Sequence, residues 1–171
     1  MSNLPPPRLT IASNTSSGIS TISSTSTITP LHPFGPHATG FTTLFSTSSF
    51  PASNTAPLPS SATTSIPRPG DKGTVFCTSD IPPNTTSAFH RTRTLDYMVV
   101  LKGEIVLRVD GGEEVVVGEG EMCVQRGAVH SWINKTDQWC RMLFVMLDAE
   151  AVILEDGKVL EDVFIPHKPA Q

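Results

Sequence analysis

The chain has 171 residues and a formal net charge of −4 at pH 7, with its 12 Lys and Arg residues scattered along it. This length suits one domain with a sizeable core, and the scattered positive charge argues against nucleic acid as a partner. The chain contains no run of about 18 apolar residues and no signal-like N-terminal segment. We therefore expect a soluble, cytoplasmic protein that does not contact a membrane. Three cysteines, Cys77, Cys123 and Cys140, lie far apart without a CxxC pair, so we expect reduced thiols.

Residues 1–72 are rich in Ser, Thr and Pro and carry no charged residue between Arg8 and Arg68. Such composition is typical of disorder. Apolar and aromatic side chains nevertheless gather between residues 28 and 45, and Thr-rich runs suit strands. We therefore expect an irregular extension that packs on the domain, with residues 54–65 as its mobile loop.

From Gly73 onward, short apolar runs alternate with turn signals, a pattern that predicts an all-β sandwich or barrel over residues 73–147. The pairs Lys102-Gly103 and Asp110-Gly111 mark tight hairpin turns. In the C-terminal tail, residues 148–171, a further hairpin is expected around Gly157. The predicted strands lie near residues 73–79, 85–92, 96–102, 104–110, 113–118, 121–126, 129–134 and 139–147.

Apart from Asp96, the strand at residues 96–101 is apolar on both faces. Alternation places Asp96, Met98 and Val100 on one face, and Tyr97, Val99 and Leu101 on the other. Because a strand that is apolar on both faces must also be covered on its outer face, we expect a cover there. The N-terminal half or a second copy in a homodimer would provide it.

Two segments carry candidate chemistry. In "HRTRTLD", His90 and Thr92 share a face of their strand, and Asp96 follows a bend. In "QRGAVHSWIN", His130 and Asn134 follow the glycine turn at Gly127. An antiparallel sandwich can bring such segments together inside the barrel.

These segments resemble the two motifs of the cupin family, which consists of small jelly-roll β-barrels. His90 matches the first histidine of the HxH motif, Thr92 stands at the second, and Asp96 stands at the glutamate. Gly103 matches the closing glycine of that motif. In the second motif Gly127, His130 and Asn134 match, whereas Gln125 replaces a proline. The resemblance covers residues 73–147 and implies a cupin-like jelly roll with an irregular Ser/Thr/Pro-rich N-terminal extension.

The family's metal ligands are reduced in this sequence to His90, Asp96 and His130, which we also consider the candidate catalytic residues. Two histidines and one carboxylate suit non-haem Fe(II) with open positions, and Mn(II), Ni(II) and Zn(II) are alternatives. A second alternative is a site without metal, in which a histidine is a general base. Asp96 would then orient a histidine or an arginine instead of binding a metal.

Five residues are candidates for substrate contact. Strand alternation places Trp132 on the same face as His130. Gln125 points into the barrel if its neighbour Arg126 faces water. Phe144 either walls an apolar pocket or belongs to the core. By contrast, Asn134 is expected to brace a turn, and His32, His37 and His167 to be structural. The candidate substrate-binding residues are Thr92, Met98, Gln125, Trp132 and Phe144.

The form of both motifs resembles single-domain cupins of fungal natural-product pathways, for which oxidoreductase or other tailoring roles are proposed. The resemblance implies a metal-dependent oxidoreductase acting on an oxygenated, aromatic or polyketide-like small molecule. The alternatives are a metal-free cyclase, dehydratase or decarboxylase, and a binding module without catalysis. Homodimers are common in the family, so we expect one here.

Overall fold

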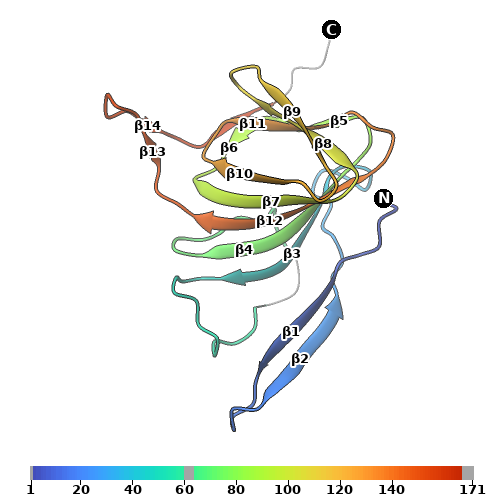
Figure 1. Ribbon diagram of the computed structural model, residues 1–171, viewed down its shortest axis with the longest axis vertical. Coiled ribbons are helices and arrows are strands. Elements are labelled where there is room, and N and C mark those ends of the chain that lie inside the picture. Colours follow the sequence, from blue (N-terminus) through green and yellow to red (C-terminus); the bar gives the residue numbers. More distant parts are fainter. Residues whose placement is uncertain (1, 60–63, 167–171) are drawn as a thin grey trace.

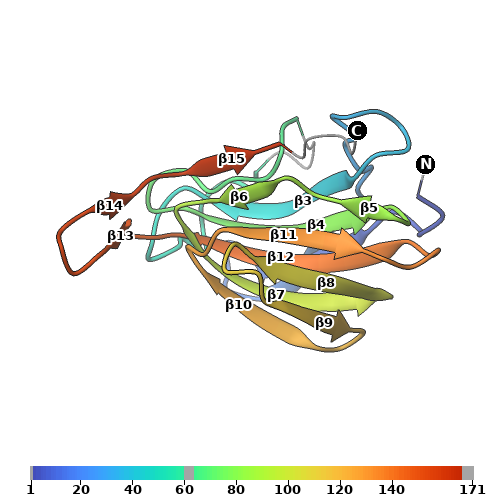
Figure 2. The ribbon, with the colours of Figure 1, turned by 90° about the horizontal axis from the view of Figure 1, so that it is seen from above.

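Short strands separated by turn residues pair into two facing antiparallel sheets (Figure 1), seen from above in Figure 2. The computed structural model describes residues 2–59 and 64–166, and no helix occurs in those two ranges. The first sheet has the order β10 (Met122–Arg126), β7 (Thr94–Lys102), β12 (Cys140–Asp148), β4 (Thr74–Ile81), β3 (Gly40–Thr47). The second has the order β15 (Val163–Ile165), β6 (Phe89–Arg91), β11 (His130–Asn134), β8 (Glu104–Val109), β9 (Glu114–Gly118), with β5 (Thr85–Thr86) also paired to β11.

This arrangement confirms the all-β jelly-roll prediction. The strands expected from residue 73 onward are present within a few residues of their predicted ends, with one exception. The segment predicted as a single strand at 85–92 is divided into β5 and β6. Ser87 lies at the break, where its hydroxyl accepts a hydrogen bond from the Trp132 amide at 2.9 Å. The Ser87 amide still donates to the Trp132 carbonyl oxygen at 2.9 Å, but its side chain accepts the return bond that a backbone carbonyl would accept in a regular ladder.

The core lies between the inner faces of the two sheets. On β7, Asp96, Met98 and Val100 are buried, whereas Tyr97 and Leu101 are 49% and 44% exposed. The predicted alternation of this strand is therefore confirmed. Nine buried side chains make up the larger apolar cluster, namely Ile81, Met98, Val100, Ile105, Leu107, Val117, Trp132, Cys140 and Met142.

Glycines permit the tight turns that set the strand register. Gly103, between β7 and β8, has a φ of +79°, and a Cβ there would lie 3.2 Å from the Trp139 carbonyl oxygen. Gly127, before β11, has a φ of +64°. Both positions favour glycine, as predicted, because L side chains rarely adopt this conformation.

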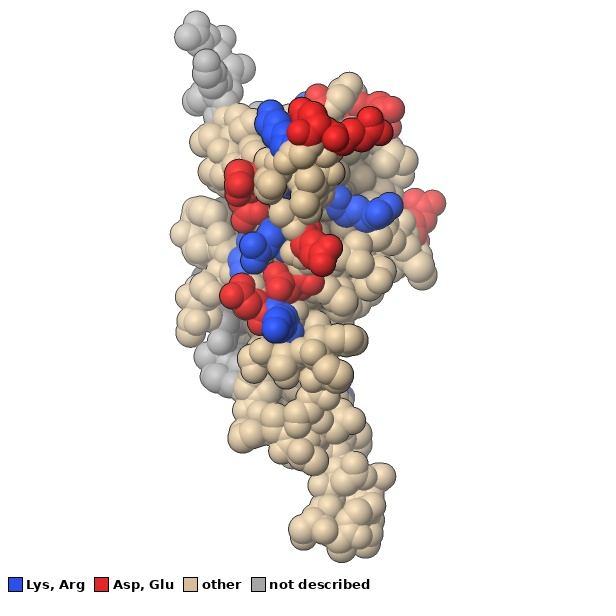
Figure 3. Space-filling view, turned by 90° about the vertical axis from the view of Figure 1, so that its left-hand side faces the viewer, with Lys and Arg blue, Asp and Glu red and all other residues tan. Residues whose placement is uncertain are grey.

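The N-terminal half contributes β3, which pairs with β4 at the edge of the first sheet. The hairpin of β1 (Arg8–Asn14) and β2 (Ser20–Thr27) instead projects from the barrel (Figure 1). In Figure 3 the charged residues gather over the barrel, and the projecting end shows none on that face. The expected mobile loop at residues 54–65 lies partly outside the described residues.

Of the two covers expected for the outer face of β7, the N-terminal half does not provide one, because Tyr97 and Leu101 remain exposed. Sheet order explains the difference, since β12 and β4 separate β3 from β7. The N-terminal segment instead reaches the β4 side of this face. There Arg141 forms a bidentate pair with buried Asp80, at 2.6 Å for both contacts, and donates to the Pro5 carbonyl oxygen at 2.8 Å.

In the tail, β13 (Val152–Ile153) pairs with β14 (Val159–Leu160), which confirms the hairpin predicted around Gly157. The three cysteines are free. Within residues 2–59 and 64–166, no helix is long and apolar enough to cross a membrane.

Candidate functional site

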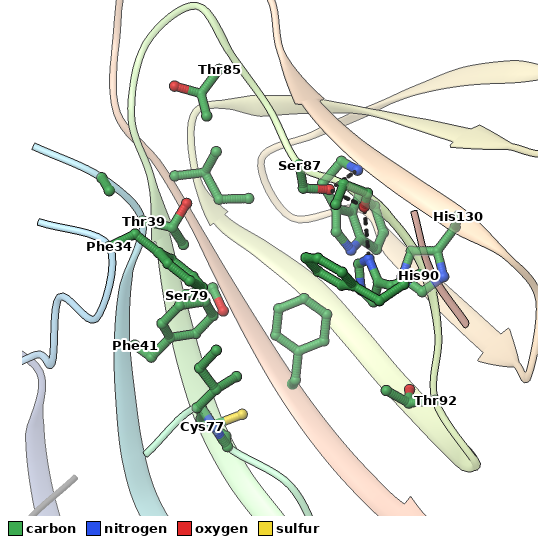
Figure 4. A pocket seen from close by; sticks show the side chains of 18 of the residues that line it. Phe34, Thr39, Phe41, Cys77, Ser79, Thr85, Ser87, His90, Thr92 and His130 are labelled. Atoms are coloured by element: carbon green, nitrogen blue, oxygen red, sulfur yellow. Dashed lines mark hydrogen bonds between the residues drawn. The ribbon is translucent and has the colours of Figure 1, made fainter. Parts of the chain in front are cut away.

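Two histidines face each other across neighbouring strands (Figure 4). His90 on β6 and His130 on β11 are direct partners in the strand register. Side chains directly opposite on one face of an antiparallel pair lie close enough to interact. The centroids of the two imidazole rings are 4.3 Å apart, with 51° between the ring planes. The structure therefore brings together the two histidines that the sequence singled out.

Each ring is held in the same way. Nδ1 of His90 lies 3.0 Å from the Ala88 carbonyl oxygen, and Nδ1 of His130 lies 2.9 Å from the Ala128 carbonyl oxygen. Because a carbonyl oxygen only accepts, Nδ1 carries the proton in both rings. In the neutral imidazole, Nε2 then has the free lone pair. Both histidines line the same pocket.

Burial keeps these imidazoles neutral. Burial is the main cause that lowers the pKa of His130 to about 4, and the charge of His90 lowers it further. Burial also lowers the pKa of His90 below its ordinary value of 6.5. At neutral pH both rings therefore present an unprotonated nitrogen, and repulsion disfavours a proton on both at once.

The pocket lies between the two sheets and encloses about 630 Å³, a volume suited to a small organic ligand. Figure 4 shows His90 and His130 on one side and Phe41, Cys77 and Ser79 on the other. The wall is mainly apolar and includes five large aromatic side chains, Phe34, Phe41, Trp132, Phe144 and Phe164.

Asp96 enters the same pocket from β7, in the sheet opposite the histidines. Asp96 is 4% exposed, and its Oδ1 has no hydrogen-bond partner among the described residues. Burial raises the pKa of Asp96 to about 6, while a hydrogen bond with Thr94 and the charge of Arg68 oppose that rise. The group is therefore ready to change its protonation state near neutral pH.

The predicted three-ligand metal site is not assembled in this structure. Within the described ranges, no three His, Cys, Asp or Glu side chains are grouped so that they could hold a metal ion. His90 and His130 supply two nitrogens, but Asp96 does not join them. The residues as placed therefore do not fit a site with two histidines and one carboxylate, and metal binding stays a prediction.

Three of the five predicted substrate-contact residues, Thr92, Trp132 and Phe144, line the pocket. The other two do not. Met98 packs in the apolar core cluster. Gln125 is buried, as strand alternation predicted. Its side-chain nitrogen lies 4.0 Å from the Cys123 sulfur, and Gln125 is not among the residues that line the pocket. Met98 lies two residues beyond Asp96 on β7, and Gln125 lies opposite Asp96 on β10, the edge strand of this sheet.

The remaining predicted polar residues are mostly structural. Asn134 accepts hydrogen bonds from the amide and hydroxyl of Thr136, so it braces a turn as predicted. Nδ1 of His32 lies 3.2 Å from the Ala38 carbonyl oxygen. His37 lines the pocket, and its expected structural role stays a prediction. His167 lies outside the described residues.

Sequence reasoning missed the contribution of the N-terminal half to this pocket. Phe34, Phe41 and Arg68 all line it, and so does Cys77 from β4. Burial, and secondarily the charge of Asp96, raises the pKa of the Cys77 thiol to about 12, so this cysteine is not a nucleophile. The available signal was the gathering of aromatic residues in a segment without charge.

In comparison with known proteins, residues 77–146 match the family model described as the cupin domain. Phomopsin biosynthesis cluster protein D of Diaporthe leptostromiformis is 44% identical over 92 residues, which are 53% of this chain and 48% of that protein. The cupin-domain-containing oxidoreductase fogC of Aspergillus ruber is 40% identical over 92 residues, which are 52% of this chain and 45% of that protein. The chain thus spans about half the length of the curated relatives it matches.

Among solved structures, the polyketide cyclase RemF from Streptomyces resistomycificus superposes with a TM-score of 0.52 at 19% identity. The match covers 83% of this chain and 82% of that one. At this identity the likeness supports the fold and carries no conclusion about the reaction.

Proposed function

Because residues 77–146 match the cupin family model and several relatives are named as fungal biosynthesis cluster proteins, we propose that this chain is a tailoring enzyme of secondary metabolism. Its substrate is an oxygenated, aromatic or polyketide-like small molecule bound in the pocket between the sheets. The observation that carries this proposal is the pair of neutral, carbonyl-anchored histidines facing an aromatic pocket.

The reaction step we assign to this site is proton abstraction. Nε2 of His90 or His130 takes a proton from a phenol or from a carbon next to a carbonyl group of the substrate. A positioned histidine base of this kind contributes roughly 10²- to 10⁴-fold to a rate. The resulting phenolate or enolate is electron-rich, and cyclisation, dehydration and oxidation of such compounds can each proceed through it.

Asp96 supplies the complementary acid. Its carboxyl pKa of about 6 leaves a protonated fraction near neutral pH, and its Oδ1 has no partner among the described residues. It lies on the opposite sheet from the histidines, so it reaches a different part of a bound substrate. Two groups with pKa values moved in opposite directions in one pocket suit acid and base roles.

The test is turnover of aromatic and polyketide-like pathway intermediates by wild type, His90→Gln and His130→Gln, each with and without a chelator. We expect turnover that survives the chelator and falls by about 10²- to 10⁴-fold in at least one variant. Full activity in both variants would refute the assignment of the histidine pair. Binding of intermediates without any turnover would indicate a module that only binds its ligand.

The second candidate is a metal-dependent oxidoreductase. The names of several relatives include the word oxidoreductase, whereas the metal is implied by the histidine and aspartate motif alone. It requires His90, Asp96 and His130 to come together around Fe(II), or around Mn(II), Ni(II) or Zn(II). Adding a histidine through Thr92→His separates the candidates. If a metal binds, this variant holds it more tightly and turns over more slowly because an open position is closed. If none binds, its metal content stays at the background of wild type.

A further inference from the structure

The pocket contains one guanidinium group that the proposed proton transfer does not use. Arg68 lies in the segment before β4 and lines the pocket together with Ile66 and Pro67. No other Arg or Lys of the described residues lines it. Arg68 is also exposed, so its side chain meets both the pocket and the solvent.

Arg68 lacks a carboxylate partner among the residues that the structure describes. Other basic side chains have one: Arg141 pairs with Asp80, and Arg108 with Glu114. The hydrogen bond recorded for Arg68 runs from its Nη1 to the Pro67 carbonyl oxygen at 2.8 Å. A guanidinium has five N–H donors, so most of them remain available to a ligand.

The positive charge of Arg68 acts on the whole site. It is among the causes that lower the pKa of His90, His130 and Asp96, and it also acts on Cys77. These groups come from both sheets, so the guanidinium lies near enough to influence opposite walls of the pocket. A ligand that reaches the histidines therefore lies within the field of Arg68.

We propose that Arg68 is an anion subsite and that the substrate is an aromatic carboxylic acid. The inference rests on the proposed function and names the substrate class of the same pocket. The carboxylate pairs with the guanidinium, whose planar fork matches two carboxylate oxygens. The ring system packs among Phe34, Phe41 and Phe144 and so presents its phenol or carbonyl substituents to His90 and His130.

Calorimetric titration with 3-hydroxy-2-naphthoate and with its neutral amide, 3-hydroxy-2-naphthamide, tests this subsite at pH 7.5. The two probes share a ring system and differ in the anionic group. We expect wild type to bind the acid about tenfold more tightly than the amide, as a charge-assisted contact predicts. Arg68→Met should abolish this preference while retaining amide binding, and Arg68→Lys should keep part of it. Arg126→Met, which removes the same charge from the exposed side of β10, should bind both probes as wild type does.

Thr39→Trp locates the binding site, because a bulky side chain at this pocket position should weaken the binding of both probes. A wild type that binds acid and amide equally, or an Arg68→Met variant that keeps the preference, would overturn the anion subsite and leave the proposed function standing. Failure of wild type to bind either probe would count against the aromatic pocket itself, and so against both proposals. A circular dichroism spectrum unchanged by Arg68→Met ensures that a loss of preference does not reflect unfolding.

Discussion

The carboxyl group of Asp96 is unfavourably placed inside the barrel. It is buried, one of its oxygens lacks a partner among the described residues, and its pKa is raised to about 6. A carboxyl pKa raised from 3.8 to about 6 destabilises the folded state at pH 7 by up to about 3 kcal/mol. A buried group that weakens the fold in this way is typical of a functional site.

We therefore predict that Asp96→Asn stabilises the protein near neutral pH. Between about pH 4 and 6 the folded state holds a proton on Asp96 that the unfolded state has lost. Asp96 therefore contributes to the stability of the fold at low pH, and this contribution is lost as the pH rises through 6. The Asn variant should be more stable than wild type by about 1–3 kcal/mol at pH 7.5, with a smaller difference at pH 4. Urea unfolding at both pH values measures this.

The two histidines change the stability of the fold with pH in the opposite direction, over the same pH range. Their folded pKa values are lowered, so their contribution is present above pH 6.5 and lost as pH falls toward 4. In Asp96→Asn only this histidine effect remains, and stability should rise more steeply with pH than in wild type. Asp110→Asn, at an exposed turn, is the matched control and should change little. An Asp96→Asn variant that is less stable than wild type at pH 7.5 would contradict the assignment.

At the scale of elements, Asn134 joins the end of β11 to the end of β4 and to the turn before β12. Its Nδ2 donates to the carbonyl oxygens of Ile81 at 3.2 Å and Gln138 at 2.8 Å. Its Oδ1 accepts from the amide and hydroxyl of Thr136 at 3.0 and 2.8 Å. The side chain is 1% exposed, so no water replaces these contacts easily.

Asn134→Ala should lower the free energy of unfolding by about 2–4 kcal/mol, because it leaves several buried polar groups unpaired. Chemical denaturation measures the loss. Asn54→Ala, at an exposed loop position, is the control, and its effect should stay within about 0.5 kcal/mol. Equal effects of the two substitutions would show that the Asn134 contacts do not stabilise the fold.

The β1–β2 hairpin is expected to be dispensable for the barrel. It projects from the body, and most of its residues are exposed. The Ile28 amide donates to the Pro7 carbonyl oxygen at 2.8 Å, so the two ends of the hairpin already lie side by side. Replacing residues 8–27 by a two-residue Asn-Gly turn should leave the melting temperature of the protein almost unchanged. A large fall in melting temperature would show that the hairpin packs on the barrel in solution.

For the whole molecule, we predict a homodimer through the outer face of β7 and β10. Exposed apolar side chains gather there because β10 pairs with β7: Tyr97 49%, Leu101 44%, Met122 79% and Val124 54%. A contiguous exposed apolar patch of this kind marks an interaction site. The N-terminal half does not cover it, so a second copy is the cover we propose.

Light scattering at several concentrations tests the dimer. Wild type should have the mass of two chains, and Val124→Lys should shift it toward one chain because a buried lysine charge is unfavourable at an interface. Val115→Lys, on β9 of the other sheet at a similar exposure of 54%, should leave the dimer unchanged. A wild type that is monomeric at all concentrations would refute the prediction.

Local patterns in the sequence were sufficient to predict most of the fold. Period-two alternation placed the strand faces, as Met98 and Tyr97 illustrate, and glycine turns placed the hairpins. The histidines were also predictable, because each lies in a short motif on a strand. These features depend on residues near one another in the chain.

Contacts between distant segments were decided only by the tertiary structure. The order of strands in a sheet placed β3 beside β4 and left the β7 face open. It also brought Phe34 and Arg68 into the pocket and kept Asp96 on the sheet opposite the histidines. The sequence alone thus determined which residues form strands and which carry reactive groups. The tertiary structure decided which of them meet, because strand pairing and side-chain reach depend on packing that no local pattern encodes.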